Sequence, residues 1–306
     1  MNPARLKAYL LLLIVSVIWG VAGPIIKFTL GGISPLLFLT YRFFLSSLVA
    51  IIFISFTGFH LPKDKNLLVK LIIFSILTST ISLGLLFLGI EKTTVLDLSL
   101  INLITPLLVS VAGVYFLREH ITFREKIGMG IALVGTALIV FEPFLGVNHQ
   151  SLKFSGNVLI FLSLLAGAYA SVLAKELLRN DISPATLAHA SFIVGLATIL
   201  PISLFIYTPS QIIQSVSTLP FPYHLGVVFM AILSGNLAYT LWSKAQKTIE
   251  ISEAAIFSYL YPIFAAPLAI LWLKEKITIP YIIGGIIIAI GVVIAEYKKP
   301  KKEIAS

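Results

Sequence analysis

The sequence contains no cysteine among its 306 residues, and only 11% of its residues are charged. Without cysteine it can form neither a disulfide framework nor a thiolate metal site. The five histidines are scattered, with no pair at the spacing that two metal ligands need on one helix. We therefore expect no metal and no cofactor. A soluble chain of this length could not cover its surface with so few charges, so the apolar stretches are expected to face lipid.

Two kinds of catalytic motif are missing as well. No glycine-lysine motif that cradles phosphate is present, so we do not expect this chain to hydrolyse ATP. No convergent group of histidine, aspartate and glutamate indicates an enzyme. The net charge of +9 would suggest nucleic acid as the partner of a soluble protein. Here the basic residues lie in short loops and at the tail, so the expected partner is the lipid bilayer and not nucleic acid.

Apolar residues make up 58% of the chain. A run of roughly 20 such residues is long enough to cross a bilayer as a helix. The sequence predicts an all-α integral membrane protein with ten transmembrane helices. The predicted spans are Ala8–Phe28, Pro35–Thr57, Leu67–Gly89, Val95–Phe116, Ile127–Phe144, Leu152–Ala174, Pro184–Tyr207, Tyr223–Trp242, Ala254–Leu273 and Pro280–Tyr297. The uncharged segment Thr208–Pro222 is expected at the outer interface.

The basic residues predict the orientation of these spans. If the N-terminus is cytoplasmic, sixteen of the 22 lysines and arginines lie on the cytoplasmic side and five on the outer side. Arg42 lies within a span. This bias places both termini in the cytoplasm, including the basic tail 298–306. Because the chain shows no organelle-targeting segment, a prokaryotic plasma membrane is favoured.

The chain also repeats itself. Leu117-Arg118-Glu119-His120-Ile121-Thr122 returns as Leu273-Lys274-Glu275-Lys276-Ile277-Thr278, at a shift of 156 residues. The same shift overlays Pro106 on Pro262, Gly128 on Gly284 and Gly135 on Gly291. The predicted repeats are residues 8–145 and 152–297, each with five helices. A repeat with an odd number of spans must insert in opposite orientations, so we predict an inverted repeat, a geometry typical of transporters.

Several motifs resemble one known family. They are Trp19-Gly20 with Lys27, Tyr41-Arg42-Phe43, Pro106 followed by Phe116-Leu117-Arg118-Glu119, the glycine-rich fifth helix, Leu237-Ala238-Tyr239-Thr240-Leu241-Trp242, Tyr261-Pro262 and Leu273-Lys274-Glu275. Together they are similar to the drug/metabolite transporter superfamily, with two EamA repeats over roughly Tyr9–Ala295. The resemblance implies ten helices, a substrate cavity between the two halves, the fifth helix of each repeat at the periphery, and export of small metabolites, often amino acids or related compounds.

The two halves differ chemically. The second half has no counterpart of Trp19, and Tyr169, in the comparable region, is expected to take its place. Arg42 aligns with Ser191, so the second half has no arginine there. A charge at the depth of Arg42 is costly and faces a cavity or a partner. Arg42 could bind a substrate carboxylate or phosphate, could reach the outer interface, or could pair with Asp97 or a helix-end carbonyl.

The remaining candidate residues each have a functional and a structural interpretation. Polar and aromatic side chains within spans could bind substrate or hold helices together. With Arg42, the candidates for substrate binding are Trp19, Tyr41, Ser79, Asn102, Tyr169, Ser234, Asn236, Tyr239 and Ser258. Trp242 is expected to be an interfacial anchor. Lys27 and Lys175 are expected to extend along their helices to the interface.

Two prolines and four acidic residues are predicted to have structural roles. Pro106 and Pro262 are predicted hinges, although static kinks are equally allowed. Asp97 and Glu253 fall in first turns and are predicted helix caps, while Glu119 and Glu275 are predicted to bond the start of the following helix or to pair with nearby basic residues. The stripe of glycines in the fifth and tenth spans predicts close helix packing, either within one chain or between two copies in a homodimer.

These features favour a secondary transporter that moves a small metabolite by alternating access. Efflux of lipophilic or cationic drugs is the main alternative. A membrane scaffold or sensor that transports nothing, and an enzyme that modifies lipid, are the alternatives from other classes.

Overall fold

Helices account for every regular element in the part of the chain that the computed structural model describes, which is residues 3–57, 61–118, 123–145 and 151–296. The first half contains α1 (Pro3–Thr29), α2 (Pro35–Thr57), α3 (Lys65–Ser75), the π-helical segment η1 (Ile76–Ser82), α4 (Leu83–Lys92), α5 (Val95–Asn102), α6 (Thr105–Leu117) and α7 (Phe123–Leu145). The second half contains α8 (Ser151–Arg179), α9 (Pro184–Ile206), α10 (Pro209–Ser217), α11 (Phe221–Val228), the π-helical segment η2 (Phe229–Leu237), α12 (Ala238–Thr248), α13 (Ile251–Ala255), the 3₁₀ segment η3 (Ile256–Leu260), α14 (Tyr261–Leu271) and α15 (Ile279–Glu296).

Eight helical segments in the described residues are long and apolar enough to cross a membrane. They coincide with eight of the ten predicted spans. The fifth and tenth predicted spans correspond to α7 and to the shorter apolar helix Ile279–Ala295. The chain is therefore an all-helical multi-pass membrane protein. The predicted tail 298–306 lies outside the described residues.

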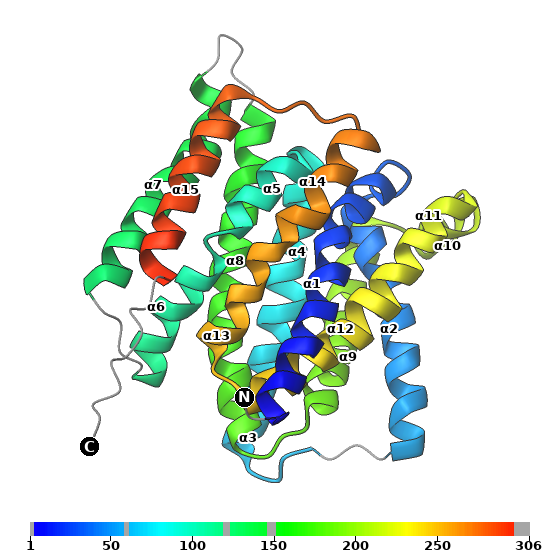
Figure 1. Cartoon of the computed structure of the whole chain (residues 1–306). Helices are drawn as coiled ribbons and strands as arrows, with labels where there is room; N and C mark the ends of the chain where they lie inside the picture. Colours follow the sequence, from blue (N-terminus) through cyan, green and yellow to red (C-terminus); the bar gives the residue numbers. More distant parts are fainter. Residues whose placement is uncertain (1–2, 58–60, 119–122, 146–150, 297–306) are drawn as a thin grey trace, which may run out of the picture.

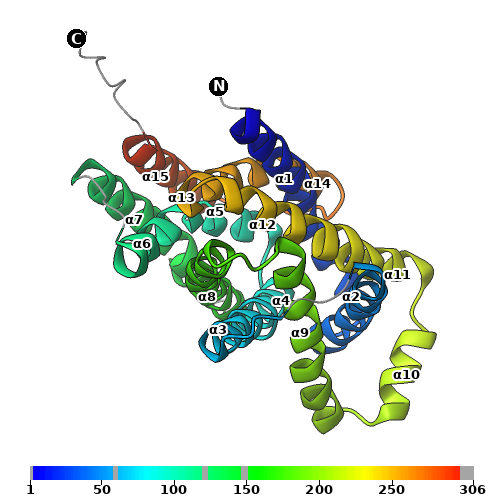
Figure 2. The ribbon, with the colours of Figure 1, turned by 90° about the horizontal axis from the view of Figure 1, so that it is seen from below.

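The two halves run in opposite directions. Figure 1 shows α1 rising from the end of the bundle where the chain begins, whereas α8 descends from the other end. We call these the α1-start end and the α8-start end. Seen along the bundle in Figure 2, α7 and α15 lie together on one side, and α10 projects from another.

Local sequence signals explain where the helices start. The side-chain oxygen of Thr94 accepts the backbone N–H of Asp97 at the start of α5, and Ser183 does the same for α9. Thr208 and Gln211 form a capping box at α10, within the segment predicted to lie at the interface. Such caps satisfy backbone donors that the first helical turn leaves free.

The glycine stripe packs α7 against α15 within the chain. A Cβ atom added to Gly128 would lie 2.5 Å from the Gly291 carbonyl oxygen, and one added to Gly291 would lie 2.5 Å from the Ala132 nitrogen. Only glycine allows backbones to approach so closely. The structure thus favours the intrachain alternative for these glycines, and the homodimer stays an untested prediction.

Backbone symmetry extends to the two copies of the repeated motif. Arg118 and Lys274, which are 156 residues apart, both adopt a left-handed conformation with φ of 58°. This conformation is uncommon for residues other than glycine. It ends α6 at Arg118, and it falls at the corresponding place after α14. The matched strain indicates that the sequence repeat is also a repeat of backbone structure.

Candidate functional site

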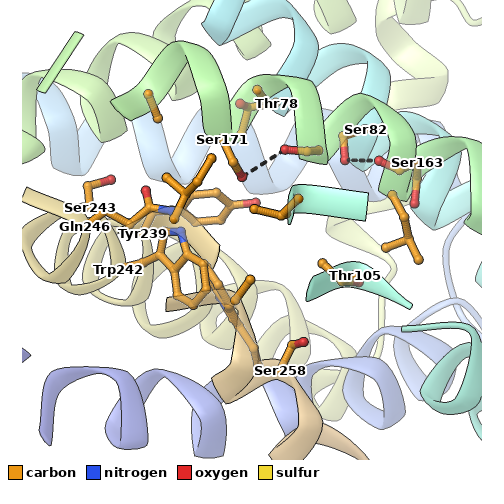
Figure 3. Close-up of a pocket in the computed structure, with 18 of the residues that line it drawn as sticks. Thr78, Ser82, Thr105, Ser163, Ser171, Tyr239, Trp242, Ser243, Gln246 and Ser258 are labelled. Carbon is orange, nitrogen blue, oxygen red and sulfur yellow. Dashed lines mark hydrogen bonds between the residues drawn. The ribbon is translucent and has the colours of Figure 1, made fainter. Parts of the chain in front are cut away.

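A central cavity lies between the two halves and consists of two compartments. The inner compartment, nearer the α1-start end, has a volume of about 200 Å³, and the outer compartment, nearer the α8-start end, has about 180 Å³. Both are lined by Trp19, Asn102, Ser163, Tyr239 and Tyr261, so these residues surround the junction between the compartments. Figure 3 shows polar groups converging on the inner compartment from several helices, among them Thr78, Gln246 and Ser258.

Six of the ten predicted substrate-binding residues line this cavity. They are Trp19, Arg42, Asn102, Ser234, Tyr239 and Ser258. They come from α1, α2, α5, η2, α12 and η3, so both halves contribute. Elements that are far apart in sequence thus build one site.

Arg42 is completely buried and faces the outer compartment. Its Nε donates a 3.0 Å hydrogen bond to the Met230 carbonyl, while Nη1 and Nη2 have no hydrogen-bond partner. The guanidinium carbon lies 5.8 Å from the ring of Phe43 and 5.6 Å from that of Phe87, within the range of cation–π attraction. Arg42 thus binds one carbonyl inside the π-helical segment η2, not the expected helix-end carbonyl, and leaves its two terminal nitrogens without a protein partner. The interpretations in which it pairs with Asp97 or reaches the interface are wrong.

The two π-helical segments bring backbone and hydroxyl groups to this site. A π turn misaligns the usual backbone hydrogen bonds, and such turns are frequent at functional sites. In η2, the Ser234 carbonyl accepts the Trp19 indole N–H at 3.0 Å, and the Met230 carbonyl accepts Arg42. The matching η1 contains Ser79, and its last residue, Ser82, donates to the Ser163 carbonyl at 2.9 Å. Three of the predicted substrate-binding residues, Ser79, Ser234 and Asn236, therefore lie in π-helical segments.

Aromatic rings form the wall where the compartments meet. The ring centroid of Trp19 lies 5.1 Å from that of Tyr239, 5.2 Å from that of Trp242 and 6.3 Å from that of Tyr261. Such distances are typical of favourable aromatic pairs. Trp242 lines the inner compartment, so its expected role as an interfacial anchor is wrong. Tyr261 and Gln246 were not predicted; for Tyr261, the Tyr-Pro motif was the available signal.

Both predicted kinks occur. The fourth span breaks after Asn102, and α6 starts anew with Pro106 as its second residue. The ninth span passes through a 3₁₀ segment containing Ser258, and Pro262 is the second residue of α14. A proline without an N–H fits the first turn, where no donor is needed. Motion at these breaks stays a prediction.

Four predicted binding residues do not line the cavity. Tyr41 bonds His224 at 3.1 Å, and the side-chain nitrogen of Asn236 donates to the carbonyls of Ser46 and Ala231. Ser79 is buried beside Gly195.

The fourth of these residues, Tyr169, packs against Phe116 with ring centroids 4.9 Å apart, in a separate pocket with Arg118 and Arg179. The expectation that Tyr169 takes the place of Trp19 is therefore wrong, because Tyr169 lines this separate pocket and not the central cavity.

Two lysines cap helix ends at opposite ends of the bundle. The ammonium of Lys27 donates to the carbonyls of Ile90, Glu91 and Thr93 at 2.7–3.0 Å, where α4 ends. The ammonium of Lys175 donates to those of Gln246 and Ile249 at 2.9 and 2.6 Å, where α12 ends. The expectation that they extend to the interface is wrong, because unpaired carbonyls and the helix dipole attract them inward.

Glu275 caps a helix, but not the one expected. Its two carboxylate oxygens accept the backbone N–H groups of Val95 and Leu96, at 2.8 and 3.0 Å, so it caps α5 of the other half instead of the following helix. Burial raises the pKa of the Glu275 carboxyl above its usual value, against the opposing effect of these two hydrogen bonds. Glu119 lies outside the described residues.

The two predicted capping acids form ion pairs. Glu253 accepts hydrogen bonds from Arg5, at 2.6 Å, and from Tyr9. Asp97 lies in the first turn of α5, as predicted, and pairs with Lys153 at 3.1 Å. Lys153 also binds Glu142 at 2.5 Å. Within the described residues, no group of three or more His, Cys, Asp and Glu residues could hold a metal ion.

Comparison with known proteins shows the family to which the chain belongs. The model of the EamA-like transporter family matches residues 6–141 and 154–297. The chain is 24% identical over 292 residues to Uncharacterized transporter YyaM of Bacillus subtilis, covering 95% of this chain and 94% of that protein. It is 25% identical over 294 residues to a protein of Salmonella typhimurium named "Probable amino-acid metabolite efflux pump", covering 95% of both.

A similarly named Escherichia coli protein is 22% identical over 291 residues, with 94% of both chains covered. A solved protein crystal structure shares the fold, with a TM-score of 0.63 at 17% identity, over 95% of this chain and 97% of its own. The names of these relatives indicate transport rather than enzymatic catalysis.

Proposed function

Because the chain belongs to the EamA-like transporter family, we propose that it is a secondary transporter that moves a small metabolite across the plasma membrane by alternating access. The observation that carries this proposal is the central cavity, which residues from both oppositely oriented halves line at the break points of their helices. Inverted halves around a shared site allow a bundle to rock between two related states.

The names of two relatives support a proposal for the substrate class. Two of them are named amino-acid metabolite efflux pumps, so we propose that the substrate is an amino acid or a related compound and that transport is outward. The cavity size fits a small solute. Even together, the compartments lie near the lower end of the ~300–1,000 Å³ range of small-molecule sites.

For the orientation, we propose ten spans, with α7 and α15 included and both termini in the cytoplasm. The bias of lysine and arginine supports this arrangement. Because the chain has no cysteine, single cysteines can be introduced without background labelling. A membrane-impermeant maleimide added to intact cells should label Ser217→Cys in α10 and not Lys63→Cys, which lies before α3. The reverse pattern would invert the orientation.

Transport itself is tested by reconstitution. Liposomes that contain the purified protein are loaded with a mixture of amino acids and their derivatives, and the solutes that leave are identified by mass spectrometry against protein-free liposomes. We expect selective, saturable release of a few solutes. If no solute leaves faster than from protein-free liposomes, while the protein is folded and inserted, the transport proposal is wrong.

A further inference from the structure

The charge of the central cavity comes from a single side chain. Among the described residues that line the two compartments, Arg42 is the one charged residue, and no aspartate, glutamate, lysine or histidine accompanies it. Its Nη1 and Nη2 have no hydrogen-bond partner, although the residue is completely buried. A buried cation without a counterion is unfavourable, so the site attracts an anion.

The planar shape of the Arg42 guanidinium limits which anions fit the site. Nε of Arg42 already binds Met230, which holds the guanidinium in place, while its two buried terminal nitrogens have no acceptor in the protein. These nitrogens carry donors in one plane, and a carboxylate accepts such a pair in bidentate fashion. The Arg42 compartment therefore matches the carboxylate end of a small organic molecule.

The inner compartment has a different chemistry. Thr78 Oγ1, Gln246 Nε2 and Ser258 Oγ are buried there without hydrogen-bond partners. The amide nitrogen of Gln246 can only donate, and the two hydroxyls can donate or accept. These groups suit a neutral acceptor such as a carbonyl or hydroxyl oxygen. An ammonium group would find no carboxylate in either compartment, and Arg42 would repel it.

Resting on the transport function proposed above, we propose that the substrate is an organic monoanion with an uncharged far end. Its carboxylate binds Arg42, its body packs against Trp19 and Tyr239 at the junction, and its neutral polar end reaches Gln246 and Ser258. Free zwitterionic amino acids and lipophilic cations are poor ligands. N-acylated amino acids and oxo or hydroxy acids have the required chemistry.

Three molecules of similar shape test this proposal by thermal shift of the purified full-length protein. N-acetyl-L-leucine is an anion, L-leucine a zwitterion and L-leucinamide a cation. A ligand that binds only the folded state stabilises it by RT ln(1 + [L]/Kd) and so raises the Tm, more strongly the tighter it binds at a given concentration. We expect a clear rise with N-acetyl-L-leucine, a smaller one with L-leucine and none with L-leucinamide. Arg42→Gln should weaken binding of the anion by about tenfold or more.

Two further variants separate binding from folding. Arg179→Gln removes an exposed arginine outside the cavity and should keep the full shift. Ser234→Asp adds a carboxylate to the Arg42 compartment and should abolish the shift with N-acetyl-L-leucine, even if Arg42→Gln does not fold. Any other order among the three ligands, including no rise with the anion, overturns the monoanion proposal. Liposome release decides the transport proposal separately, because it does not depend on which charge class moves.

Discussion

The buried ion cluster at the α8-start end offers a sharp test of the electrostatics of this fold. Lys153 Nζ lies 3.1 Å from Asp97 Oδ2 and 2.5 Å from Glu142 Oε2, and the three side chains are only 13%, 6% and 15% exposed. Asp97 also accepts a hydrogen bond from Asn157 at 3.2 Å. Two carboxylates thus share one ammonium, which makes Lys153 the residue on which the cluster depends.

We predict that Lys153→Met destabilises the protein far more than Glu142→Gln. Two unit charges about 4 Å apart interact by ~4 kcal/mol at an effective dielectric constant of about 20. Removing one partner of a buried ion pair lowers the free energy of unfolding by ~3–5 kcal/mol. Loss of Lys153 leaves two buried carboxylates without a cation. Glu142→Gln instead leaves a balanced pair of Lys153 and Asp97 and a side chain that can still hydrogen-bond, so we expect a smaller cost of about 1–2 kcal/mol.

The assay is thermal unfolding of the purified protein in detergent, followed by tryptophan fluorescence. The predicted losses correspond to a drop in Tm of roughly 10 °C for Lys153→Met and a change of at most a few degrees for Glu142→Gln. Lys153→Arg keeps the charge and serves as the control, with a loss between the two. Equal losses for Lys153→Met and Glu142→Gln would refute the reasoning, because they would mean that packing and not charge balance holds this cluster together.

Three further predictions concern the scaffold. Gly291→Ala should lower the free energy of unfolding by ~1–3 kcal/mol, because the added methyl group would meet the backbone of the facing helix. Gly130→Ala is the control: its methyl group would meet nothing within 4 Å, so it should be neutral or slightly stabilising. Thermal unfolding compares the two variants. Lys175→Met should cost about 1.5–3 kcal/mol through the loss of two charged hydrogen bonds to carbonyls, and Lys175→Arg should recover part of this in the same assay. Pro106→Ala and Pro262→Ala should each slow turnover in liposomes more than they weaken ligand binding, and weaker binding with normal turnover would contradict a hinge role.

The sequence predicted the helices well because the physics behind them is local. Long apolar runs mark the spans, and the positions of Pro106 and Pro262 mark breaks that the structure shows. Polar candidates within the third and eighth spans, Ser79 and Ser234 among them, could also be picked from the sequence. The π-helical geometry around them could not, because it depends on side chains from other helices that bond the misaligned carbonyls, as Trp19 does.

The errors in the predicted site have a common physical cause. A lysine near a helix end can extend to the interface or turn inward to carbonyl groups, and only the neighbouring helices decide which; for Lys27 they supply three carbonyls. Tyr169 lies in α8 of the second half, but its side chain lines a separate pocket and not the central cavity. The cavity position of Gln246 could not be predicted, because no local sequence pattern distinguishes an amide that faces a cavity from one that faces a helix end.

Some features of the protein are shared by its two halves, and others occur in one half only. The lysine caps at Lys27 and Lys175, the two π-helical turns and the left-handed residues Arg118 and Lys274 occur once in each half. All of them shape the backbone. The cationic group of the cavity occurs in one half only, because Arg42 aligns with Ser191 in the second half. A symmetric scaffold can take up two mirror-related states of similar energy, whereas a solute with two different ends needs an asymmetric site. Because the cationic group lies in one compartment and the neutral donors in the other, a bound monoanion would keep one orientation relative to the bundle while the scaffold around it changes state.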